Sequence, residues 1–558
     1  MEHHAFGLFP QDSSGWTRRQ VLRAGALTAL MLAGGSVPKR ATGYAPANVP
    51  FSLGVASGDP THDSVLLWTR LATDPLNGGG MAPEPIEVRW TVATDPHMHH
   101  VVRRGATLAL PANAHSVHLR VNGLAPDRWY WYRFTAGSTD SPIGRTRTVP
   151  APDSQPRELR FAFVSCQNYE AGYYTALQNL AEEEIDFVIH LGDYIYDENA
   201  DWHRVRAHFP NSEPVSLEDY RHRHAQYRLD PYLQAAHARF PFFVSWDDHE
   251  VEDNYADLVS THNADLDTSN DVSEPEFRQR LSAAYKAFFE HMPIDPQSST
   301  ASGALRLYRK CNWGRLAEIC LLDTRQYRTT QPCRGANDRI APIGDDIVVP
   351  CGEELAENAT ITGDEQERWI IDSLRHSRAR WNVIAQQVMM ASVDFGPGVG
   401  TFDSRFAGTQ VRNVDAWDGY VAARNRLLGA VRDNAVQNVI VLSGDVHSSW
   451  VNELKADFTE TTSPVVATEF VGPSVTSHFP TTFLPVISSA LADPANNHVK
   501  FFEGTLHGYV RCHVTPERWR SDYRVVDTVA RPNANVRTLK SFLVNDRDPA
   551  AAPVEAVA

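Results

Sequence analysis

Cysteine is scarce in this chain, and acidic residues outnumber lysine and arginine. Six cysteines among 558 residues are too few for a disulfide scaffold. With a formal net charge of −16, the chain has no excess of lysine and arginine side chains to neutralise the phosphates of a nucleic acid. We therefore expect no nucleic-acid-binding surface. A negative charge of this size also repels small anionic substrates, and a site for such substrates would therefore need bound metal ions.

The apolar run near the N-terminus is too short to span a membrane. It covers about residues 24–37, whereas a spanning helix needs roughly 20 apolar residues. It follows Arg18 and Arg19 in the segment T-R-R-Q-V-L-R, an order that resembles a Tat export signal, with a buried amphipathic helix as the alternative. We therefore predict a signal peptide over residues 1–45, the Tat machinery as a partner, a periplasmic or secreted location, and no transmembrane segment in the mature chain.

The first part of the mature chain has the pattern of a β-sandwich. At 558 residues the chain is several times the usual domain size, so more than one domain is expected. Leu124 and Pro126 before Tyr130 resemble the tyrosine corner of immunoglobulin-like sandwiches, so we predict a fibronectin type III-like domain over 46–150. Short alternating runs that favour antiparallel strands lie at 64–71, 86–93 and 116–121.

The pattern changes after the proline-containing segment 149–152, where β runs begin to alternate with helical segments. We therefore predict an α/β domain over 151–535 and a C-terminal tail over 536–558. Helices are expected at 174–184 and 366–378. Six nearly continuous apolar runs, typical of strands covered on both faces, lie at 159–166, 186–193, 240–248, 316–325, 381–388 and 438–447.

Two further features belong to the long connections of this domain. Cys333 and Cys351 bracket a polar segment that contains proline and glycine. In an exported protein they could form a disulfide or remain free thiols, and the spacing does not decide between the two. The segments 253–280 and 326–366 have the pattern of long surface excursions, which often control access to a site.

Polar or ionisable residues end five of the six apolar runs. In layered α/β folds, binding sites form in the crevice at the carboxyl ends of the strands. We therefore expect these side chains to surround one depression. The endings are Ser165-Cys166, Gly192-Asp193, Asp247-Asp248-His249-Glu250, Asp323-Thr324-Arg325 and Gly444-Asp445-Val446-His447.

The residue types at these endings suit metal ions. A thiolate from Cys166 and a phenolate from Tyr196, beside the carboxylate of Asp193, suit ferric iron, which lowers the pKa of its ligands. A second position for a divalent ion could be completed by Asp248, Asn254, Asp445 and His447.

Each residue taken alone has a structural alternative. Cys166 could be an inert buried thiol, Tyr196 a core residue and Asp193 a helix cap, and only their joint occurrence favours a metal site. Neighbours on a strand point to opposite faces, so Asp247 and Asp248 would separate unless the strand has ended. We expect Asp248 to bind metal and Asp247 to brace a neighbour.

Several segments around these residues resemble the alkaline phosphatase D (PhoD) family, a branch of the calcineurin-like and purple acid phosphatase metallophosphoesterases. The resemblance runs from residue 50 to about 530. It implies a four-layer αββα metallophosphoesterase core preceded by the small fibronectin-like sandwich. The matching segments are FSLGVASGDP, LLWTR, FVSCQ, HLGDYIYD, WDDHEVEDN, DTRQYR and LSGDVH.

The resemblance also implies cofactors, namely one ferric iron and one or two calcium ions. Many relatives have asparagine directly before the histidine of an N-H-E motif, whereas this chain has Asp248 before His249. The sequence leaves open whether Asn254 or Asp247 shares the role that this asparagine has in those relatives. By position, the iron ligands would be Cys166, Asp193, Tyr196 and His447, with Asp193 as the bridge, and the calcium contacts Asp248, Asn254 and Asp445.

The predicted function is hydrolysis of phosphomonoesters and phosphodiesters, in which metal-bound hydroxide attacks phosphorus. We group His249, Arg325 and Asp247 as candidate catalytic residues. His249 would be an acid or a phosphate contact, and Arg325 would add positive charge, with a structural salt bridge as its equal alternative. Another possible substrate is phospholipid, cleaved by a phospholipase D-type phosphodiesterase with the same ions. A third alternative is a binding protein that has lost turnover.

Overall fold

The structure is a computed structural model that describes residues 49–198, 204–264, 271–296, 305–333, 339–340, 344–460 and 462–554. The predicted signal peptide, residues 1–45, lies outside these ranges. In the part of the chain that is described, none of the helices has both the length and the apolar character that a membrane crossing requires.

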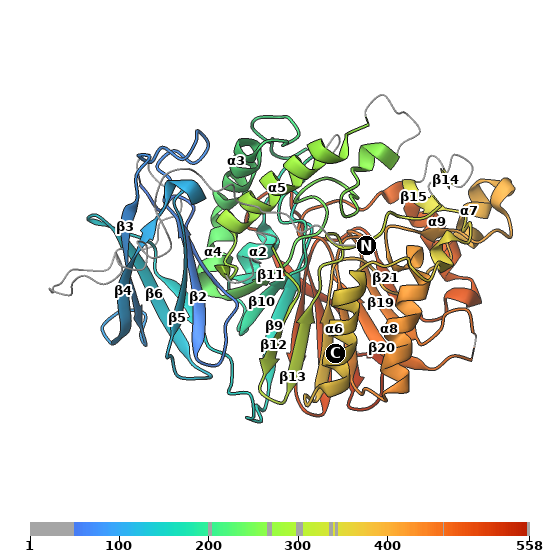
Figure 1. Cartoon of the computed structure of the whole chain (residues 1–558). Coiled ribbons are helices and arrows are strands. Elements are labelled where there is room, and N and C mark those ends of the chain that lie inside the picture. Colours follow the sequence, from blue (N-terminus) through green and yellow to red (C-terminus); the bar gives the residue numbers. More distant parts are fainter. Residues whose placement is uncertain are drawn as a thin grey trace.

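Two sheets packed face to face form the centre of the protein (Figure 1). Their facing side chains, among them Phe161, Ile189, Val383 and Ile440, make one buried cluster. The larger sheet has the order β25 (Ala551–Pro553), β24 (Val536–Asn545), β23 (Arg518–Val526), β22 (Gly508–Val514), β9 (Leu159–Val164), β10 (Phe187–His190), β11 (Pro241–Val244), β1 (Val55–Gly58), β2 (Ser64–Arg70) and β5 (Ser116–Asn122). The smaller has the order β12 (Arg309–Trp313), β13 (Ala317–Leu321), β16 (Trp381–Ala385), β18 (Val439–Ser443), β20 (Val465–Val471), β19 (Ser449–Lys455) and β21 (Val499–Glu503).

Helices cover the outer face of each sheet. Val188 of β10 packs in one buried cluster with Phe288 of α5, and Val441 of β18 packs in another with Leu374 of α6 and Leu428 of α8. The four layers are therefore helix, sheet, sheet, helix, as predicted. The helices are α2 (Thr175–Leu180), α3 (Leu217–Arg228), α4 (Pro231–Arg239), α5 (Glu274–His291), α6 (Gly363–His376), α7 (Gly396–Phe402), α8 (Val421–Asp433) and α9 (Leu484–Leu491).

Local sequence explains where the helices of the larger sheet begin. Ser216 and Asp219 form a capping box at the start of α3, so both side chains satisfy backbone N–H groups that the first turn leaves free. Asp230 accepts hydrogen bonds from two backbone N–H groups of α4, and Pro231 follows it at the first helical position. These caps set the path of the chain between β10 and β11.

The N-terminal region is a β-sandwich that shares a sheet with the core. One sheet of the sandwich has the order β4-β3-β6-β7, with β8 against β6, and the other is the β1-β2-β5 end of the ten-stranded sheet. Ser57 of β1 pairs in parallel with Pro241 of β11. The Tyr130 hydroxyl accepts a hydrogen bond from Ala125 N at 2.9 Å, so the predicted tyrosine corner is present. The remaining strands are β3 (Ile86–Ala93), β4 (Val101–Ala109), β6 (Trp129–Ala136), β7 (Thr139–Asp140) and β8 (Gly144–Arg147).

The domain division predicted at residue 150 stays a prediction, but the predicted tail at 536–558 needs correction. This segment forms β24 and β25, the last strands of the larger sheet. Phe542 and Val544 are buried between the two sheets, because alternate residues of β24 are apolar and face the core. The predicted helix at 174–184 is also shorter than expected, since α2 ends at Leu180.

Cys333 and Cys351 form a disulfide, so the first of the two alternatives is confirmed. The bond closes an insertion that carries a small sheet of its own. Val348 packs with Cys333 and Val414 in a buried cluster beneath the bond. The sheet contains β14 (Arg339–Ile340), β15 (Gly344–Val348) and β17 (Arg412–Asn413).

Several buried histidines make the stability of the fold depend on pH. Burial lowers the pKa of His498 to about 4 and that of His190 and His224 to about 3. Because these values lie below the ordinary value of 6.5, the unfolded chain binds protons that the folded protein does not. The part of the free energy of unfolding that depends on these neutral histidines is fully present above about pH 6.5. It is lost as the pH falls toward the folded-state pKa, by at most about 1.4 kcal/mol per pH unit for each histidine.

We therefore predict that the melting temperature falls between about pH 7.5 and pH 5, and that His224→Leu makes this fall smaller. His224 is suitable because neither ring nitrogen has a hydrogen-bond partner among the described residues. Calorimetric melting across this pH range measures the effect. His376→Gln is the control, since the side chain of His376 is 68% exposed. Identical pH profiles for wild type and His224→Leu would contradict the prediction.

Candidate active site

The predicted site residues lie where strands of both sheets end. The strands β9, β10 and β11 run parallel to one another in the larger sheet, and β13, β16 and β18 do so in the smaller. The apolar runs extend further than the strands, because β10 ends at His190, β11 at Val244 and β18 at Ser443. The predicted ligands therefore lie on the loops that follow, not on the strands themselves.

These loops turn sharply, and five predicted metal ligands adopt the left-handed backbone conformation. This conformation costs a non-glycine residue roughly 1 kcal/mol or more, and such residues gather at functional sites. The turns bring side chains from separate loops toward one point. The φ angles are +59° for Cys166, +55° for Asp193, +53° for Asn254, +65° for Asp445 and +52° for His447.

The four residues predicted to bind iron lie together. Ligand atoms of Cys166, Asp193 and His447 lie within 4.8 Å of one another. The Tyr196 hydroxyl donates a hydrogen bond to Asp193 Oδ2 at 2.9 Å and lies 3.1 Å from His447 Nε2. Ser477, which the sequence did not indicate, donates to the Tyr196 hydroxyl at 2.7 Å. One thiol, one carboxylate, one phenol and one imidazole therefore converge.

The tautomer of His447 suits a metal ligand. Its Nδ1 lies 3.3 Å from the backbone carbonyl oxygen of His478, which can only accept a hydrogen bond. Nδ1 therefore carries the proton, and Nε2 keeps its lone pair on the side of Asp193 and Tyr196. Burial and the neighbouring His249 lower the pKa of His447 to about 4, which favours the neutral ring.

The residues predicted for the second position also meet. Carboxylate oxygens of Asp247, Asp248 and Asp445 lie within 4.8 Å of one another, and Asp193, Asp248 and His249 form a further such group. Because β11 ends before the acidic pair, Asp247 and Asp248 do not separate to opposite faces. Asn254 joins this position through its backbone N–H, which donates to Asp248 Oδ2 at 2.7 Å.

Arg325 lies beneath these carboxylates. Its side chain is fully buried, and its guanidinium donates to Asp247 Oδ1 at 2.5 Å and to both oxygens of Asp415 at 2.8 Å. A third contact, of 3.3 Å, reaches Asp445 Oδ1. All of its donor nitrogens are thus used inside the protein, which supports a structural salt bridge, the second of its two predicted roles.

Two important residues of this network were not assigned a role from the sequence. Asp415 accepts hydrogen bonds from Arg325, from Arg328 Nη1 at 2.6 Å and from Gln331 Nε2 at 2.8 Å. Glu250 accepts from the backbone N–H groups of Asp193, Tyr194 and Asp247, and thereby ties the loop after β10 to the loop after β11. Glu250 follows the predicted ligands in the W-D-D-H-E segment, but no motif marks Asp415.

Negative charge exceeds positive charge at this site. Within its described residues, two buried arginines, Arg325 and Arg328, face five buried acids: Asp193, Asp247, Asp248, Glu250 and Asp415. Burial of an unpaired carboxylate is strongly unfavourable. Burial accordingly raises the pKa of Asp193 and Asp247 well above the ordinary range, and raises that of Asp445 to about 7.

Two buried carboxylate oxygens that accept no hydrogen bond in the described part of the chain mark where cations fit. Asp193 Oδ1 and Asp248 Oδ1 have no hydrogen-bond partner among the described residues. Both atoms belong to carboxylates of the clusters that contain the remaining predicted ligands. Cations placed there would satisfy these oxygens and neutralise the excess charge, so the donor set fits bound metal.

His249 occupies a fixed position at the edge of this centre. Its Nδ1 lies 2.7 Å from Asp197 Oδ1, and its ring stacks on that of Tyr196 with 4.1 Å between the centroids. Burial alone lowers the pKa of His249, but the carboxylates of Asp248 and Asp193 raise it well above the ordinary value. Its Nε2 lies 3.6 Å from Asp253 Oδ1, a longer contact than the one that holds Nδ1.

The disulfide-closed insertion reaches the second position. Asp346 of β15 accepts a hydrogen bond from Asn254 Nδ2 at 2.8 Å, and Gln331 Nε2 donates to the Asn254 carbonyl oxygen at 2.8 Å. Since a carboxylate only accepts, the amide nitrogen of Asn254 faces Asp346 and the amide oxygen is left for a cation. The insertion therefore orients Asn254, a predicted ligand. The sequence did not suggest this role for the insertion.

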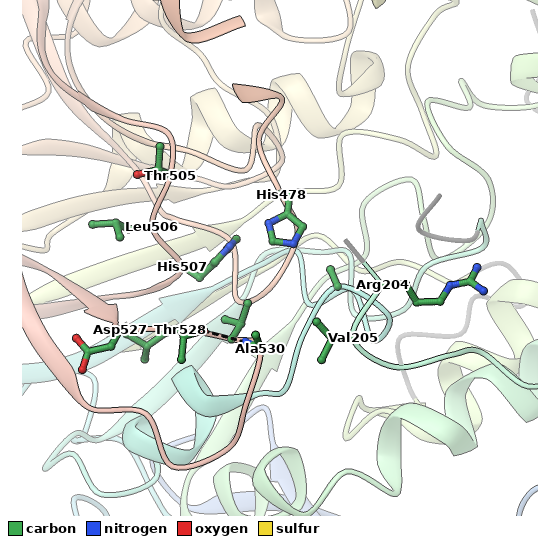
Figure 2. Close-up of a pocket in the computed structure, with 12 residues that line it drawn as sticks. Arg204, Val205, His478, Thr505, Leu506, His507, Asp527, Thr528 and Ala530 are labelled. Atoms are coloured by element: carbon green, nitrogen blue, oxygen red, sulfur yellow. Dashed lines mark hydrogen bonds between the residues drawn. The ribbon is translucent and has the colours of Figure 1, made fainter. Parts of the chain in front are cut away.

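A cavity of about 440 Å³ opens beside the centre, and Figure 2 shows the residues that line it. Its wall includes His478, the residue whose carbonyl oxygen holds His447. None of the described residues that line it is phenylalanine, tyrosine or tryptophan. Six of its lining residues are Arg204, His478, Leu506, His507, Asp527 and Val529.

Known proteins match this chain over most of its length. Residues 161–523 match the model of the PhoD-like phosphatase family, and residues 37–150 match that of the PhoD-like phosphatase N-terminal domain. Alkaline phosphatase D of Bacillus subtilis (strain 168) is 43% identical over 502 residues, which cover 89% of this chain and 81% of that protein. A solved structure of PhoD superposes with a TM-score of 0.82 at 41% identity, over 93% of this chain and 94% of that one.

These matches agree with the resemblance predicted from the motifs and with the observed layers. The fold is therefore confirmed as a β-sandwich followed by a metallophosphoesterase-like α/β domain. The enzyme class is confirmed as well, since both the family and its curated relative are phosphatases. The chain belongs to the PhoD-like phosphatase family and is a phosphoric ester hydrolase similar to alkaline phosphatase D.

Proposed function

We propose that this enzyme hydrolyses phosphomonoesters and phosphodiesters outside the cytoplasm with one ferric iron and one or two calcium ions. The observation that carries the proposal is the convergence, in a phosphatase fold, of carboxylate oxygens from Asp193 and Asp248 that accept no hydrogen bond among the described residues. Cations bound there would neutralise charge on the phosphoryl oxygens and activate water. Export by the Tat route is proposed on the paired Arg18 and Arg19.

The two cation positions differ in donor chemistry. The thiol, phenol and imidazole at the first position favour ferric iron, and the carboxylate and amide oxygens at the second favour calcium. Asp193 belongs to both groups and would bridge them. We assign Cys166, Asp193, Tyr196 and His447 to iron, and Asp248, Asn254 and Asp445 to calcium.

The protein side chains position the substrate and supply a proton. We assign His249 Nε2 as the donor to the leaving oxygen, because the Asp197 contact fixes the ring through Nδ1 and the only other polar contact of Nε2 among the described residues is a longer one, of 3.6 Å, to Asp253 Oδ1. Asp247 and Arg325 act as positioning residues, since their mutual ion pair holds the acidic loop in place. The water-soluble substrates are preferred over phospholipids because the described cavity wall lacks the aromatic side chains that a lipid-binding rim would use.

The iron assignment predicts a coloured protein. Purified enzyme should absorb visible light through charge transfer from the Tyr196 phenolate, and metal analysis should find iron with calcium. Tyr196→Phe should remove the band, whereas Tyr173→Phe, on a residue outside the centre, should not. A colourless active preparation with zinc as its metal would exclude ferric iron.

The bridging role predicts the effect of Asp193→Asn. An amide cannot neutralise two cations, so kcat/KM for a simple phosphomonoester should fall by more than about 100-fold. Steady-state kinetics measures this loss, and circular dichroism should report an unchanged fold. Asp372→Asn is the matched control, because Asp372 is 72% exposed on α6. Retention of activity in the Asp193 variant would refute the bridge.

The contact between Asp346 and Asn254 predicts that a substitution of Asp346 changes the affinity for calcium and leaves the iron position unchanged. Asp346→Ala should weaken calcium binding by about 10-fold, the range seen when a residue that orients a metal ligand is removed. Asp346→Asn should retain most of the affinity, because its amide oxygen still accepts from Asn254. Calorimetric titration of chelator-treated protein measures the affinity, and the iron band should not change. Equal calcium affinities in all three proteins would contradict this role.

A further inference from the structure

The cavity beside the metal-binding centre shares a wall with it. The loop that contains residues 474–478 contacts the centre from one side, since the Ser477 hydroxyl lies within hydrogen-bond distance of the Tyr196 hydroxyl, at 2.7 Å, and of the Cys166 carbonyl oxygen, at 2.9 Å. The next residue, His478, holds His447 through its carbonyl oxygen and lines the cavity with its ring. A group attached to phosphorus at the centre could therefore extend into this cavity.

The charge of the cavity suits an uncharged organic group. Arg204 is the one lysine or arginine among the described residues of its wall, and it is ion-paired with Glu170 at 3.3 Å. Asp527 adds a negative charge, which disfavours a second phosphate. Leu506 and Val529 supply apolar surface. The volume of about 440 Å³ lies within the range of small-molecule sites and is large enough for a six-membered ring.

A chain of hydrogen bonds fixes the proton on His507. The Ser474 hydroxyl donates its single proton to the Ser477 carbonyl oxygen, so toward His507 it can only accept. His507 Nδ1, which lies 3.0 Å from the Ser474 oxygen, must therefore carry the proton. In the neutral ring Nε2 then has a lone pair and no hydrogen.

The neutral form of His507 is favoured by its surroundings. Its ring meets that of His478 edge to face at 4.9 Å, and burial, His478 and His447 lower its pKa to about 3. Figure 2 shows the ring directed toward His478 at the cavity. The nitrogen that His507 offers there is a hydrogen-bond acceptor, and it remains one over the pH range in which a phosphatase works.

We propose that this cavity is the leaving-group subsite of the enzyme and that His507 selects esters whose leaving alcohol carries a second hydrogen-bond donor. The inference rests on the proposed phosphoesterase function and deepens it. The phosphoryl group would lie at the metal-binding centre, and the organic group would lie between Leu506 and Val529. A hydroxyl of that group would donate to His507 Nε2. His507 is thus a specificity-determining residue and takes no part in proton transfer to the ester oxygen.

A pair of matched substrates tests the subsite. The compounds are 3-hydroxyphenyl phosphate and 3-methoxyphenyl phosphate, whose leaving phenols are close in acidity and differ in the presence of a donor. With the holoenzyme, kcat/KM should be about 5-fold higher for the hydroxyl compound, the size expected for one hydrogen bond. The difference should appear mainly in KM, because the contact is made in the bound ester as well as in the transition state.

Variants of His507 connect this preference to one atom. His507→Phe should abolish the ratio, and His507→Gln should restore part of it, since its amide oxygen can accept in place of Nε2. His513→Gln, on a partly exposed histidine of strand β22, which begins directly after His507, should keep both the ratio and the basal rate. Equal kcat/KM for the two esters in the wild type, or an unchanged ratio in His507→Phe, would overturn the proposal.

A binding measurement separates this subsite from the proposed activity. The phosphonates 3-hydroxybenzyl phosphonate and 3-methoxybenzyl phosphonate cannot be hydrolysed at the carbon–phosphorus bond, so calorimetry reports their affinities even if no ester is turned over. Tighter binding of the hydroxyl compound, lost in His507→Phe, would support the subsite. Turnover of neither ester would count against the proposed function, whereas equal affinities of the two phosphonates would count against the subsite.

Discussion

The excess of buried negative charge at the junction of the two sheets is the constraint on which the rest of the structure depends. Arg325 offsets part of it through ion pairs to Asp247 and Asp415, and Arg328 offsets a further part. The remaining acids need cations, because isolated buried carboxylates are not stable in ionised form. The surrounding loops, the capping contacts of Glu250 and the disulfide-closed insertion all hold acidic side chains close together against their mutual repulsion.

Much of the fold could be predicted, because its strands are covered on both faces and appear as nearly continuous apolar runs. The tyrosine corner followed from a local pattern, whereas the four layers were implied by the resemblance to the PhoD family. The continuity of the ten-stranded sheet between the sandwich and the core could not be predicted in this way. The pairing of β1 with β11 joins segments far apart in the sequence and leaves no local signal. The segment that forms β24 was mistaken for a tail because the pattern of this strand differs from that of the buried parallel strands.

The predicted ligands converge as expected, because parallel strands place their carboxyl ends at one edge of each sheet. Residues that act by supporting those ligands were missed. Asp415 and Ser477 lie in loops and Asp346 lies in the short strand β15, with no spacing or motif that relates them to a metal centre. Only the folded chain brings them within hydrogen-bond distance. The left-handed turns at Cys166 and Asp193 were also unpredictable, because neither residue type favours that conformation strongly.

The order of strands in the larger sheet also constrains how the chain assembles during synthesis. β9 lies between β10, which follows it closely, and β22, which is made near the end of the chain. Until β22 emerges from the ribosome, β9 presents an unpaired apolar edge, a template for wrong pairing with other chains. A nascent or truncated polypeptide would thus be prone to aggregate, and chaperone protection would be needed until the C-terminal strands arrive. The dependence on such distant contacts also predicts slow folding relative to proteins with local topology.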